Sequence, residues 1–182
     1  MKTVWVRHGE SEYNEQGLAT GWHDPELTEL GKQQAKDIAE RIATEYPEVA
    51  GIYSSDLRRC FYTAELIKEH ASWDNDVTID NMIRERDWGE WTGLTLASLN
   101  DMEIYASVRQ GWNKAAPDGE SLRDVAGRVA TFMKDLEEND LPYIIVSHGH
   151  TIRAASVVLQ MNTPAGITDW EVKNGEHVEW VY

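Results

Sequence analysis

This sequence has few cysteines and no long apolar runs, the features that mark disulfide-rich, membrane-spanning or secreted proteins. Its 182 residues include one cysteine, Cys60, so no disulfide forms within the chain. No apolar run approaches the roughly 18 residues that a membrane-spanning helix needs. The first apolar run is interrupted by Arg7 and His8, which is too early for a signal peptide. We therefore expect one cytoplasmic domain over residues 1–182, with Cys60 buried in a helix.

Positive charge is also scarce. The chain has 17 Lys and Arg against 32 Asp and Glu, which gives a formal net charge of −15. This balance argues against nucleic acid or an anionic membrane surface as a partner, because both repel an acidic protein. Arginines that bind an anionic ligand must therefore form a local positive pocket within an acidic molecule. No feature of the sequence favours a particular oligomeric state.

Short apolar runs alternate with helical patterns along the whole chain. Strands are predicted at residues 4–6, 51–54, 77–79, 141–147 and 176–182. Helices are predicted through residues 152–159 and after the capping residues Thr28, Asp56 and Ser121. The helix after Asp56 is expected to bury Leu57, Cys60, Phe61, Ala64 and Ile67. Such alternation predicts a three-layer α/β/α sandwich with a mostly parallel mixed sheet.

Two of the apolar runs end on the same dipeptide. The first run is followed by Arg7-His8-Gly9, and the run at residues 141–147 by His148-Gly149. Open α/β sheets bind ligands beyond the carboxyl ends of their strands. If the two strands are parallel neighbours, His8 and His148 therefore lie together at that edge. A guanidinium beside imidazoles suits an anionic ligand.

Six short motifs stand in a fixed order between residues 7 and 122. They are RHGESEYN (7–14), TGWHD (20–24), LTELG (27–31), SSDLRRCFYTA (54–64), RERDWGEWTG (84–93) and DGESL (118–122). Together with the second His-Gly pair, they resemble the histidine phosphatase superfamily, in the branch related to cofactor-dependent phosphoglycerate mutase. The resemblance covers most of the chain. It implies an α/β/α domain with a short cap inserted at residues 88–117.

The resemblance also implies catalytic roles. His8 would be the nucleophile that forms a phosphohistidine. Arg7 and Arg59 would clamp the phosphoryl oxygens, because a guanidinium donates bidentately and stays charged. His148 would hydrogen-bond the phosphoryl group, and Glu85 would protonate the leaving oxygen and then activate water. On composition alone Glu85 belongs to a solvated charge run, and its register with the motif favours the catalytic role.

Several further residues are expected to contact the substrate. Those at the phosphoryl group are Asn14 and Ser11; those around the rest of the substrate are Thr20, Gly21, Arg86 and the backbone of Gly149. The resemblance places the functional arginine four residues before Thr63, which is Arg59; because adjacent helical residues point about 100° apart, Arg58 is then expected at the surface.

The run His148-Gly149-His150 is not expected to bind a metal. Alternate residues of a continuing strand face opposite sides, and no cysteine or carboxylate cluster accompanies them. No metal or other cofactor is therefore expected.

The resemblance implies a phosphomonoesterase that hydrolyses a small phosphorylated metabolite. Family mutases carry a longer insertion with additional arginines, whereas the cations between residues 94 and 117 are Arg109 and Lys114 alone, so hydrolysis is favoured over mutase-type transfer. The same residues would also suit a phosphocarrier that passes phosphate from His8 to a protein, or a non-catalytic scaffold. The scaffold is disfavoured because each of the five catalytic positions of the family carries the expected residue.

The cap segment is also rich in aromatic residues. One or two of them are expected at the pocket mouth, from Trp88, Trp91, Tyr105 and Trp112.

Overall fold

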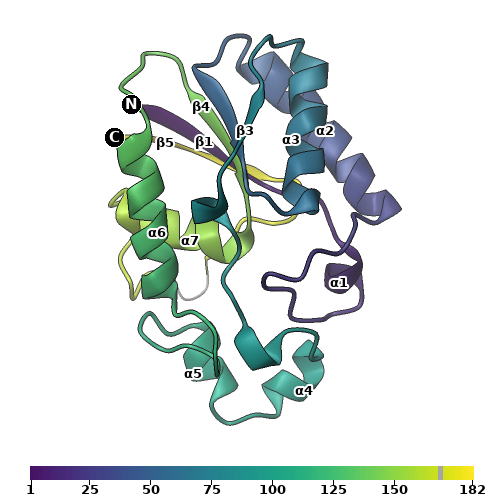
Figure 1. The fold of residues 1–182 in the computed structure, drawn as a ribbon, viewed down its shortest axis with the longest axis vertical. Helices are drawn as coiled ribbons and strands as arrows, with labels where there is room; N and C mark the ends of the chain where they lie inside the picture. The colour runs from purple at the N-terminus through teal and green to yellow at the C-terminus, as the bar shows by residue number, and fades with distance from the viewer. Residues whose placement is uncertain (168–169) are drawn as a thin grey trace.

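The computed structural model describes residues 1–167 and 170–182, and a five-stranded sheet forms its centre (Figure 1). The strands lie in the order β3-β2-β4-β1-β5, with β5 antiparallel to β1 and the other neighbours parallel. Their bounds are β1 Lys2–Arg7, β2 Gly51–Ser54, β3 Val77–Ile79, β4 Tyr143–Ser147 and β5 His177–Val181. The predicted mixed, mostly parallel sheet is confirmed, including its weakly patterned last strand.

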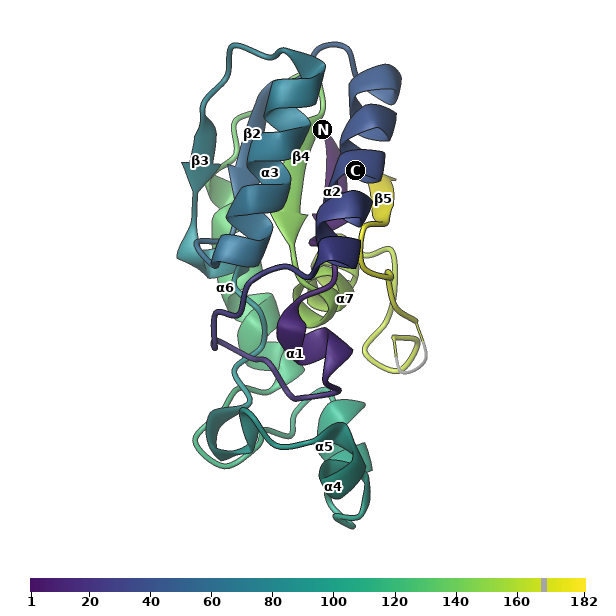
Figure 2. The same ribbon diagram turned by 90° about the vertical axis from the view of Figure 1, so that its right-hand side faces the viewer.

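Helices cover both faces of the sheet. Helices α2 (Glu29–Glu45) and α3 (Arg58–Ala71) pack together on one face, and α6 (Leu122–Asp135) and α7 (Gly149–Val158) on the other (Figures 1 and 2). The predicted α/β/α sandwich is therefore confirmed. The shorter helices are α1 Glu12–Glu15, α4 Leu96–Asn100 and α5 Tyr105–Arg109, with 3₁₀ turns at Asn81–Ile83 and Gly89–Trp91.

The central strands divide their side chains between two cores. Val4 and Val6 of β1 pack with α2 and α3, whereas Trp5 faces α6 and α7. This is the alternation that a pleated strand imposes, and both faces are apolar because helices cover both. A buried parallel strand of this kind reads as a continuous apolar run, which is the pattern that predicts β1 and β4.

The pairing of β1 with β4 sets the position of the two His-Gly pairs. The two strands are in parallel register, with Arg7 opposite Ser147. His8 and His148 therefore leave the sheet at the same level, and the His8 backbone N–H donates to the Ser147 carbonyl over 3.1 Å. The neighbouring strand β2 ends at the same edge and leads into α3, which carries Arg59.

Two details of the predicted helix after residue 56 are wrong. Leu57, not Asp56, is the N-cap of α3, and no side chain caps this helix. Asp56 instead pairs with Arg84, whose Nε and Nη2 lie 2.7 and 2.5 Å from its two carboxylate oxygens. Phe61 points outward and is 37% exposed. The caps at Thr28 and Ser121 are confirmed, the latter as a capping box with Asp124.

Residues 88–117 form a small unit beyond the carboxyl edge of the sheet (Figure 1). Its helices α4 and α5 enclose a separate apolar cluster of Trp88, Trp91, Leu99, Tyr105, Val108 and Ala116, joined by Ala19. That this unit is a cap inserted into the domain with bounds at residues 88 and 117 stays a prediction. Among the described residues, no helix combines the length and the apolar character that a membrane crossing requires.

The first turn of α2 is packed directly against the chain that follows β1. A Cβ added to Gly31 would lie 1.9 Å from the Glu10 carbonyl oxygen. Gly31→Ala should therefore lower the free energy of unfolding by about 1–3 kcal/mol, measured by urea denaturation. Gly127→Ala in α6 is the matched control, because its Cβ would meet nothing within 4 Å. It should stabilise by up to about 1 kcal/mol through helix propensity; equal losses for both variants would contradict the packing argument.

Candidate active site

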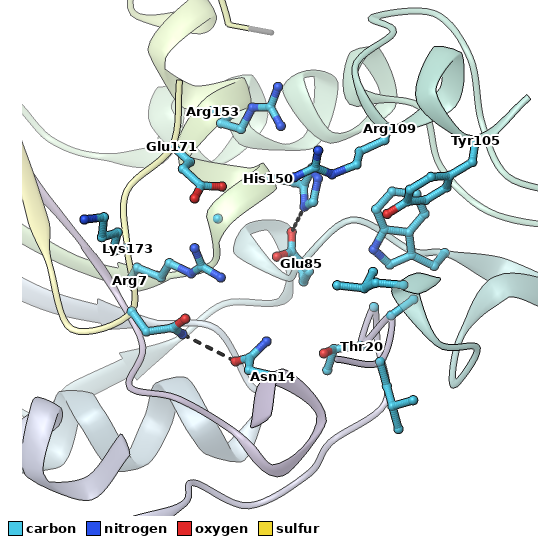
Figure 3. A pocket seen from close by; sticks show the side chains of 17 residues that line it. Arg7, Asn14, Thr20, Glu85, Tyr105, Arg109, His150, Arg153, Glu171 and Lys173 are labelled. Carbon is cyan, nitrogen blue, oxygen red and sulfur yellow. Dashed lines mark hydrogen bonds and ion pairs between the residues drawn. The ribbon is translucent and has the colours of Figure 1, made fainter. Parts of the chain in front are cut away.

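A pocket of about 300 Å³ lies at the carboxyl edge of the sheet, between the strand ends and residues 88–109 (Figure 3). Of the predicted site residues, its lining contains Arg7, Asn14, Thr20, Gly21, Glu85 and Gly149. His8, Arg59 and His148 are buried beside one another at the strand ends. The structure thus brings the five predicted catalytic residues into one region, and its cap aromatics in the lining are Trp88 and Tyr105.

The hydrogen bonds of His8 define its protonation. Nδ1 lies 2.6 Å from the Gly9 carbonyl oxygen, which can only accept, so Nδ1 carries the proton. Nε2 therefore presents a lone pair, and the Arg59 Nε–H donates to it over 3.3 Å. Burial lowers the pKa of His8 well below its ordinary value, and Arg59 and Arg7 lower it further. The imidazole is thus a neutral nucleophile with its reactive nitrogen beside a cation.

Arg59 is 1% exposed and is fixed by backbone carbonyls. Its Nη1 and Nη2 donate to the carbonyl oxygens of His23 and Gly21 over 2.8 and 3.0 Å. Gly21 is therefore both a lining residue and a support for the guanidinium. The neighbouring Arg58 has a side chain that is 60% exposed and pairs with Asp24 and Glu26, as expected of a surface arginine.

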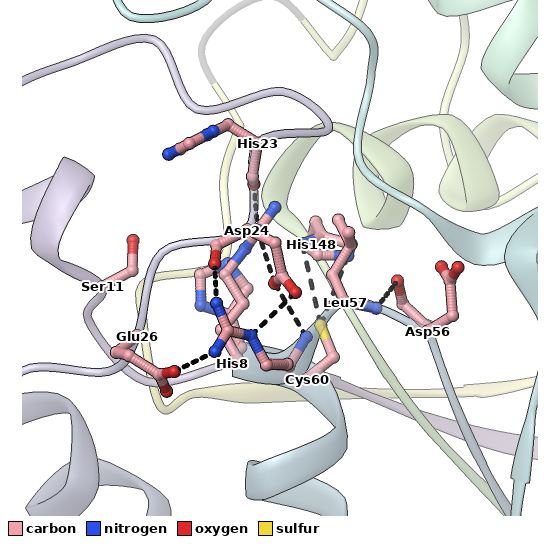
Figure 4. Close-up of polar contacts among 12 residues, drawn as sticks. His8, Ser11, His23, Asp24, Glu26, Asp56, Leu57, Cys60 and His148 are labelled. Atoms are coloured by element: carbon pink, nitrogen blue, oxygen red, sulfur yellow. Dashed lines mark hydrogen bonds and ion pairs between the residues drawn. The ribbon is translucent and has the colours of Figure 1, made fainter.

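His148 lies against both His8 and Cys60 (Figure 4). The two imidazole centroids are 5.1 Å apart, and the Cys60 sulfur lies 3.3 Å from His148 Nε2. The thiol is buried, as predicted, and burial raises its pKa. Burial also lowers the pKa of His148 well below its ordinary value, and Arg59 adds to that effect. His148 is therefore a second neutral imidazole beside the nucleophile.

One N–H group of the Arg7 guanidinium is buried without a hydrogen-bond partner among the described residues. Its Nη1 donates to the Val172 carbonyl over 2.8 Å, whereas its buried Nε has no hydrogen-bond partner in the described part of the chain. A Cβ on Gly149 would lie 3.3 Å from the Arg7 guanidinium carbon. Glycine at 149 thus lets the start of α7 approach the guanidinium closely. An unpaired buried N–H of this kind fits an anionic group.

Asn14 and Ser11 differ in what the structure lets them do. The Asn14 Oδ1 accepts from the Ser11 backbone and hydroxyl over 3.1 and 3.0 Å, which leaves its amide N–H groups for the pocket. Ser11 is fully buried as the N-cap of α1 and is absent from the lining, so the predicted substrate contact of Ser11 is not supported. Thr20 lines the pocket, and its buried Oγ1 has no partner among the described residues.

Arg86 lies outside the pocket lining, so the substrate contact that the resemblance predicts for it is not supported. It is fully buried and outside the lining, and its three nitrogens donate to the carbonyl oxygens of Glu120, Val108 and Lys114 over 2.7–3.0 Å. The guanidinium also lies 4.6 Å from the Trp88 ring centroid. Arg86 therefore ties the cap to the segment that precedes α6.

Glu85 lies 8% exposed in the pocket wall. Burial alone would raise the pKa of its carboxyl, but His150, His148 and the Arg86 backbone N–H together hold it well below its ordinary value. The carboxylate accepts from that N–H over 2.8 Å through Oε1. Bringing a phosphate dianion beside it would favour its protonated form, because like charges repel. The carboxyl is thus placed to exchange a proton with a bound phosphomonoester.

His150 lines the pocket although the sequence motifs do not assign it to the site. The strand β4 ends at Ser147 and α7 begins at Gly149, so residues 148 and 150 do not face opposite sides of a continuing strand. The His150 Nδ1 lies 3.6 Å from Glu85 Oε1, and the ring lines the pocket (Figure 3). The strand geometry assumed against a metal site is therefore wrong. Within residues 1–167 and 170–182, no three His, Cys, Asp or Glu side chains are grouped to hold a metal ion.

The outer pocket contains further charges that the motifs do not indicate. They are Arg109 from α5, Arg153 from α7, and Glu171 and Lys173 from the segment before β5. Asn174 follows, and its amide donates to the His8 carbonyl over 3.0 Å. No sequence pattern singles out residues 171–174, because an irregular segment with no motif reaches the site only through the pairing of β5 with β1.

Comparison with known proteins decides the family. The profile described as the histidine phosphatase superfamily (branch 1) matches residues 3–182. The chain belongs to this superfamily. The 2,3-bisphosphoglycerate-dependent phosphoglycerate mutase of Azorhizobium caulinodans is 33% identical over 181 residues, covering 94% of this chain and 87% of the relative. The corresponding mutase of Methylocella silvestris is 34% identical over 186 residues, with the same coverage of both chains.

Solved structures of this superfamily show the same fold. A mycobacterial glucosyl-3-phosphoglycerate phosphatase in complex with VO3 has a TM-score of 0.87 and 29% identity, covering 98% of this chain and 90% of that one. A phosphoserine phosphatase from Entamoeba histolytica, in complex with 3-phosphoglyceric acid, has a TM-score of 0.82 and 28% identity, covering 99% and 90%. The relatives thus include both mutases and phosphatases, and the Entamoeba structure contains a small phosphorylated ligand.

The neutral histidines of the site make the superfamily fold sensitive to acid. The pKa values of His8, His148 and His150 are lowered by burial, so the unfolded chain takes up protons first as the pH falls below about 6.5. The free energy of unfolding should therefore fall between pH 6.5 and 5, by up to about 1.4 kcal/mol per pH unit for each histidine. Urea titrations of the wild type and His148→Asn measure this. An unchanged slope in His148→Asn would contradict the buried neutral state.

The structural role of Arg86 is tested against Arg109. Arg86→Met leaves two carbonyl oxygens of the cap and that of Glu120 without their donors, so it should destabilise by about 3 kcal/mol or more. Arg109→Met removes an exposed lining cation and should raise KM for a phosphomonoester with little change in thermal midpoint. Thermal unfolding and steady-state kinetics separate the two effects. A stable Arg86→Met with only a raised KM would restore the substrate contact.

Proposed function

We propose that the chain is a phosphomonoesterase that hydrolyses a small phosphorylated metabolite through a phosphohistidine on His8. The observation that carries the proposal is the state of the His8 imidazole. Its Nδ1–H is bound to the Gly9 carbonyl, and its Nε2 lone pair lies beside Arg59. A neutral imidazole held in this way is prepared for attack on phosphorus and not for structural hydrogen bonding alone.

In the first step His8 Nε2 attacks phosphorus, and the bond from phosphorus to the leaving oxygen breaks. Arg7, Arg59, His148 and the Asn14 amide stabilise the negative oxygens of the transferring group. Glu85, in its protonated form, gives its proton to the leaving oxygen, so that an alcohol departs. The positive charge that develops on the imidazole is supported by the hydrogen bond from Nδ1 to the Gly9 carbonyl.

In the second step water attacks the phosphorus of phosphohistidine, and the N–P bond breaks. The Glu85 carboxylate takes a proton from that water, which returns it to the acid form. Inorganic phosphate leaves and His8 Nε2 regains its lone pair. The low pKa of Glu85 described above keeps the carboxyl ionised in the free site, and the dianion of the next substrate favours its protonation.

Hydrolysis, rather than mutase-type transfer, is supported by the openness of the outer pocket to water. Arg109, Glu171 and Lys173 in its lining are exposed, and Arg109 is the cation that the cap segment 88–117 contributes to it. A mutase must retain the phosphorylated intermediate and exclude water while transfer is completed. Mutase-type transfer is the second candidate, because the relatives at 33–34% identity carry that name.

The partner that this pocket suits is a small phosphorylated molecule. A volume of about 300 Å³ admits a metabolite-sized group. Leu18, Leu96, Trp88 and Tyr105 supply an apolar wall opposite the charged residues. The leaving group therefore meets both cations and apolar surface. Neither nucleic acid nor an anionic membrane is a proposed partner, given the net charge of −15.

The proposal is tested by hydrolysis of p-nitrophenyl phosphate in the presence of a chelator, comparing the wild type with His8→Ala. The wild type should release phosphate, and His8→Ala should lose at least about a thousandfold in rate, because no phosphoenzyme forms. Rapid quenching followed by mass spectrometry should find phosphate on His8 of the wild type. Activity that disappears with the chelator and returns with a divalent ion would contradict the mechanism.

A second assay separates the candidate functions. With 3-phosphoglycerate and 2,3-bisphosphoglycerate supplied, a phosphatase releases inorganic phosphate faster than it forms 2-phosphoglycerate. Faster isomer formation would overturn hydrolysis in favour of the mutase. A phosphohistidine that survives in water and is discharged only to a protein would indicate a phosphocarrier. Absence of both turnover and phosphoenzyme would indicate a scaffold.

A further inference from the structure

We infer that His150 is a positioning residue for Glu85: it holds carboxylate oxygen Oε1 so that Oε2 faces the leaving group. The inference rests on the proposed role of Glu85 as proton donor and acceptor. Nothing in the motifs of the chain marks residue 150 for this purpose.

The contacts of Glu85 are unequal between its two oxygens. Oε1 accepts from the Arg86 backbone N–H over 2.8 Å and lies 3.6 Å from His150 Nδ1 (Figure 3). Oε2 has no hydrogen-bond partner within the described part of the chain. One oxygen is thus anchored from two directions while the other is available for proton transfer. A contact of 3.6 Å is long for a hydrogen bond, and such contacts tighten when substrate binds.

The His150 ring is itself held in place. It stands in the first turn of α7, two residues after His148, and packs edge-to-face with the Trp88 ring, with centroids 5.3 Å apart and planes at 87°. Trp88 in turn stacks on Trp91 within the cap cluster. The ring therefore lies between the cap and the general acid, with Nδ1 on the side of Glu85. Its buried Nε2 has no partner among the described residues.

Burial keeps this imidazole neutral. Burial lowers the pKa of His150 and the guanidiniums of Arg153 and Arg86 lower it further, although Glu85 opposes them. Other groups that act on Glu85 are His148 and, through the guanidiniums beside the pocket, Arg7 and Arg59. At neutral pH His150 therefore acts on the carboxylate as an N–H dipole, not as a cation. A neutral amide in the same place should reproduce that effect.

Two variants separate hydrogen-bond donation by His150 from protonation of its ring. In His150→Asn the side-chain amide takes the place of Nδ1–H but does not titrate, and in His150→Phe a ring of similar size offers no donor. The Glu85 carboxyl is followed by ¹³C NMR as the pH is changed, and its signal is assigned by its loss in Glu85→Gln. This reading needs no substrate, so it does not depend on turnover. Circular dichroism establishes that each variant is folded.

We expect the Glu85 carboxyl of His150→Phe to titrate about 1 to 2 pH units above that of the wild type, and that of His150→Asn within about half a unit of it. With p-nitrophenyl phosphate, the acid limb of kcat should move upward by the same interval in His150→Phe. KM should change less than about twofold, because His150 does not hold the phosphoryl group.

Each other outcome overturns the inference. If the Glu85 carboxyl titrates at the wild-type pH in both variants, His150 does not act on Glu85. Equal shifts in both would mean that protonation of the ring, not donation by it, governs the carboxyl. Failure of the proposed function is read separately, from wild-type protein that neither hydrolyses p-nitrophenyl phosphate nor forms phosphohistidine.

Discussion

Parallel pairing of β1 with β4 is the constraint on which the rest of the site depends. Because Arg7 lies opposite Ser147, the residues that follow both strands emerge side by side, and His8 meets His148. A slip of one residue would separate the two imidazoles by about 3.3 Å along the strands and turn every side chain of one strand to the other face. Both faces are packed by helices, so the same apolar contacts that stabilise the sheet also fix the spacing of the catalytic groups.

A second constraint is the desolvation of cations inside an acidic molecule. Arg7 and Arg59 are held by backbone carbonyls of Val172, Gly21 and His23 rather than by carboxylates at close range. Carbonyl dipoles satisfy part of each guanidinium without neutralising its positive charge, and the Asp24 carboxylate stays 3.9 Å from Arg59 Nη1. This charge depresses the protonation of the neighbouring imidazoles and attracts a phosphate dianion. The same guanidiniums therefore preorganise the site for the anion and, together with burial, keep the nucleophile neutral.

Much of this arrangement is predictable from the sequence, and the exceptions have physical reasons. Buried parallel strands read as continuous apolar runs, and capping residues mark helix starts, so the sandwich and the strand-end histidines follow directly. Ser11 and Arg86 carry the right chemistry, but the hydroxyl caps a helix and the guanidinium binds carbonyls, and no local pattern distinguishes these uses. Asp56 does not cap α3 because its carboxylate binds Arg84, a residue distant in the sequence. His150 depends on where β4 gives way to α7, a boundary that periodicity places only to within a few residues.

The segment that precedes β5 links the edge of the sheet to the reactive histidine. Val172 accepts from Arg7, and Asn174 donates to the carbonyl oxygen of His8, immediately before β5 pairs with β1. Attachment of the last strand and completion of the anion site are therefore parts of one equilibrium. A bound anion would stabilise the attached state of the edge strand, and detachment of that strand would weaken anion binding by the same free energy. The edge of the sheet, usually its least stable part, would in this way become a reporter of occupancy at its centre.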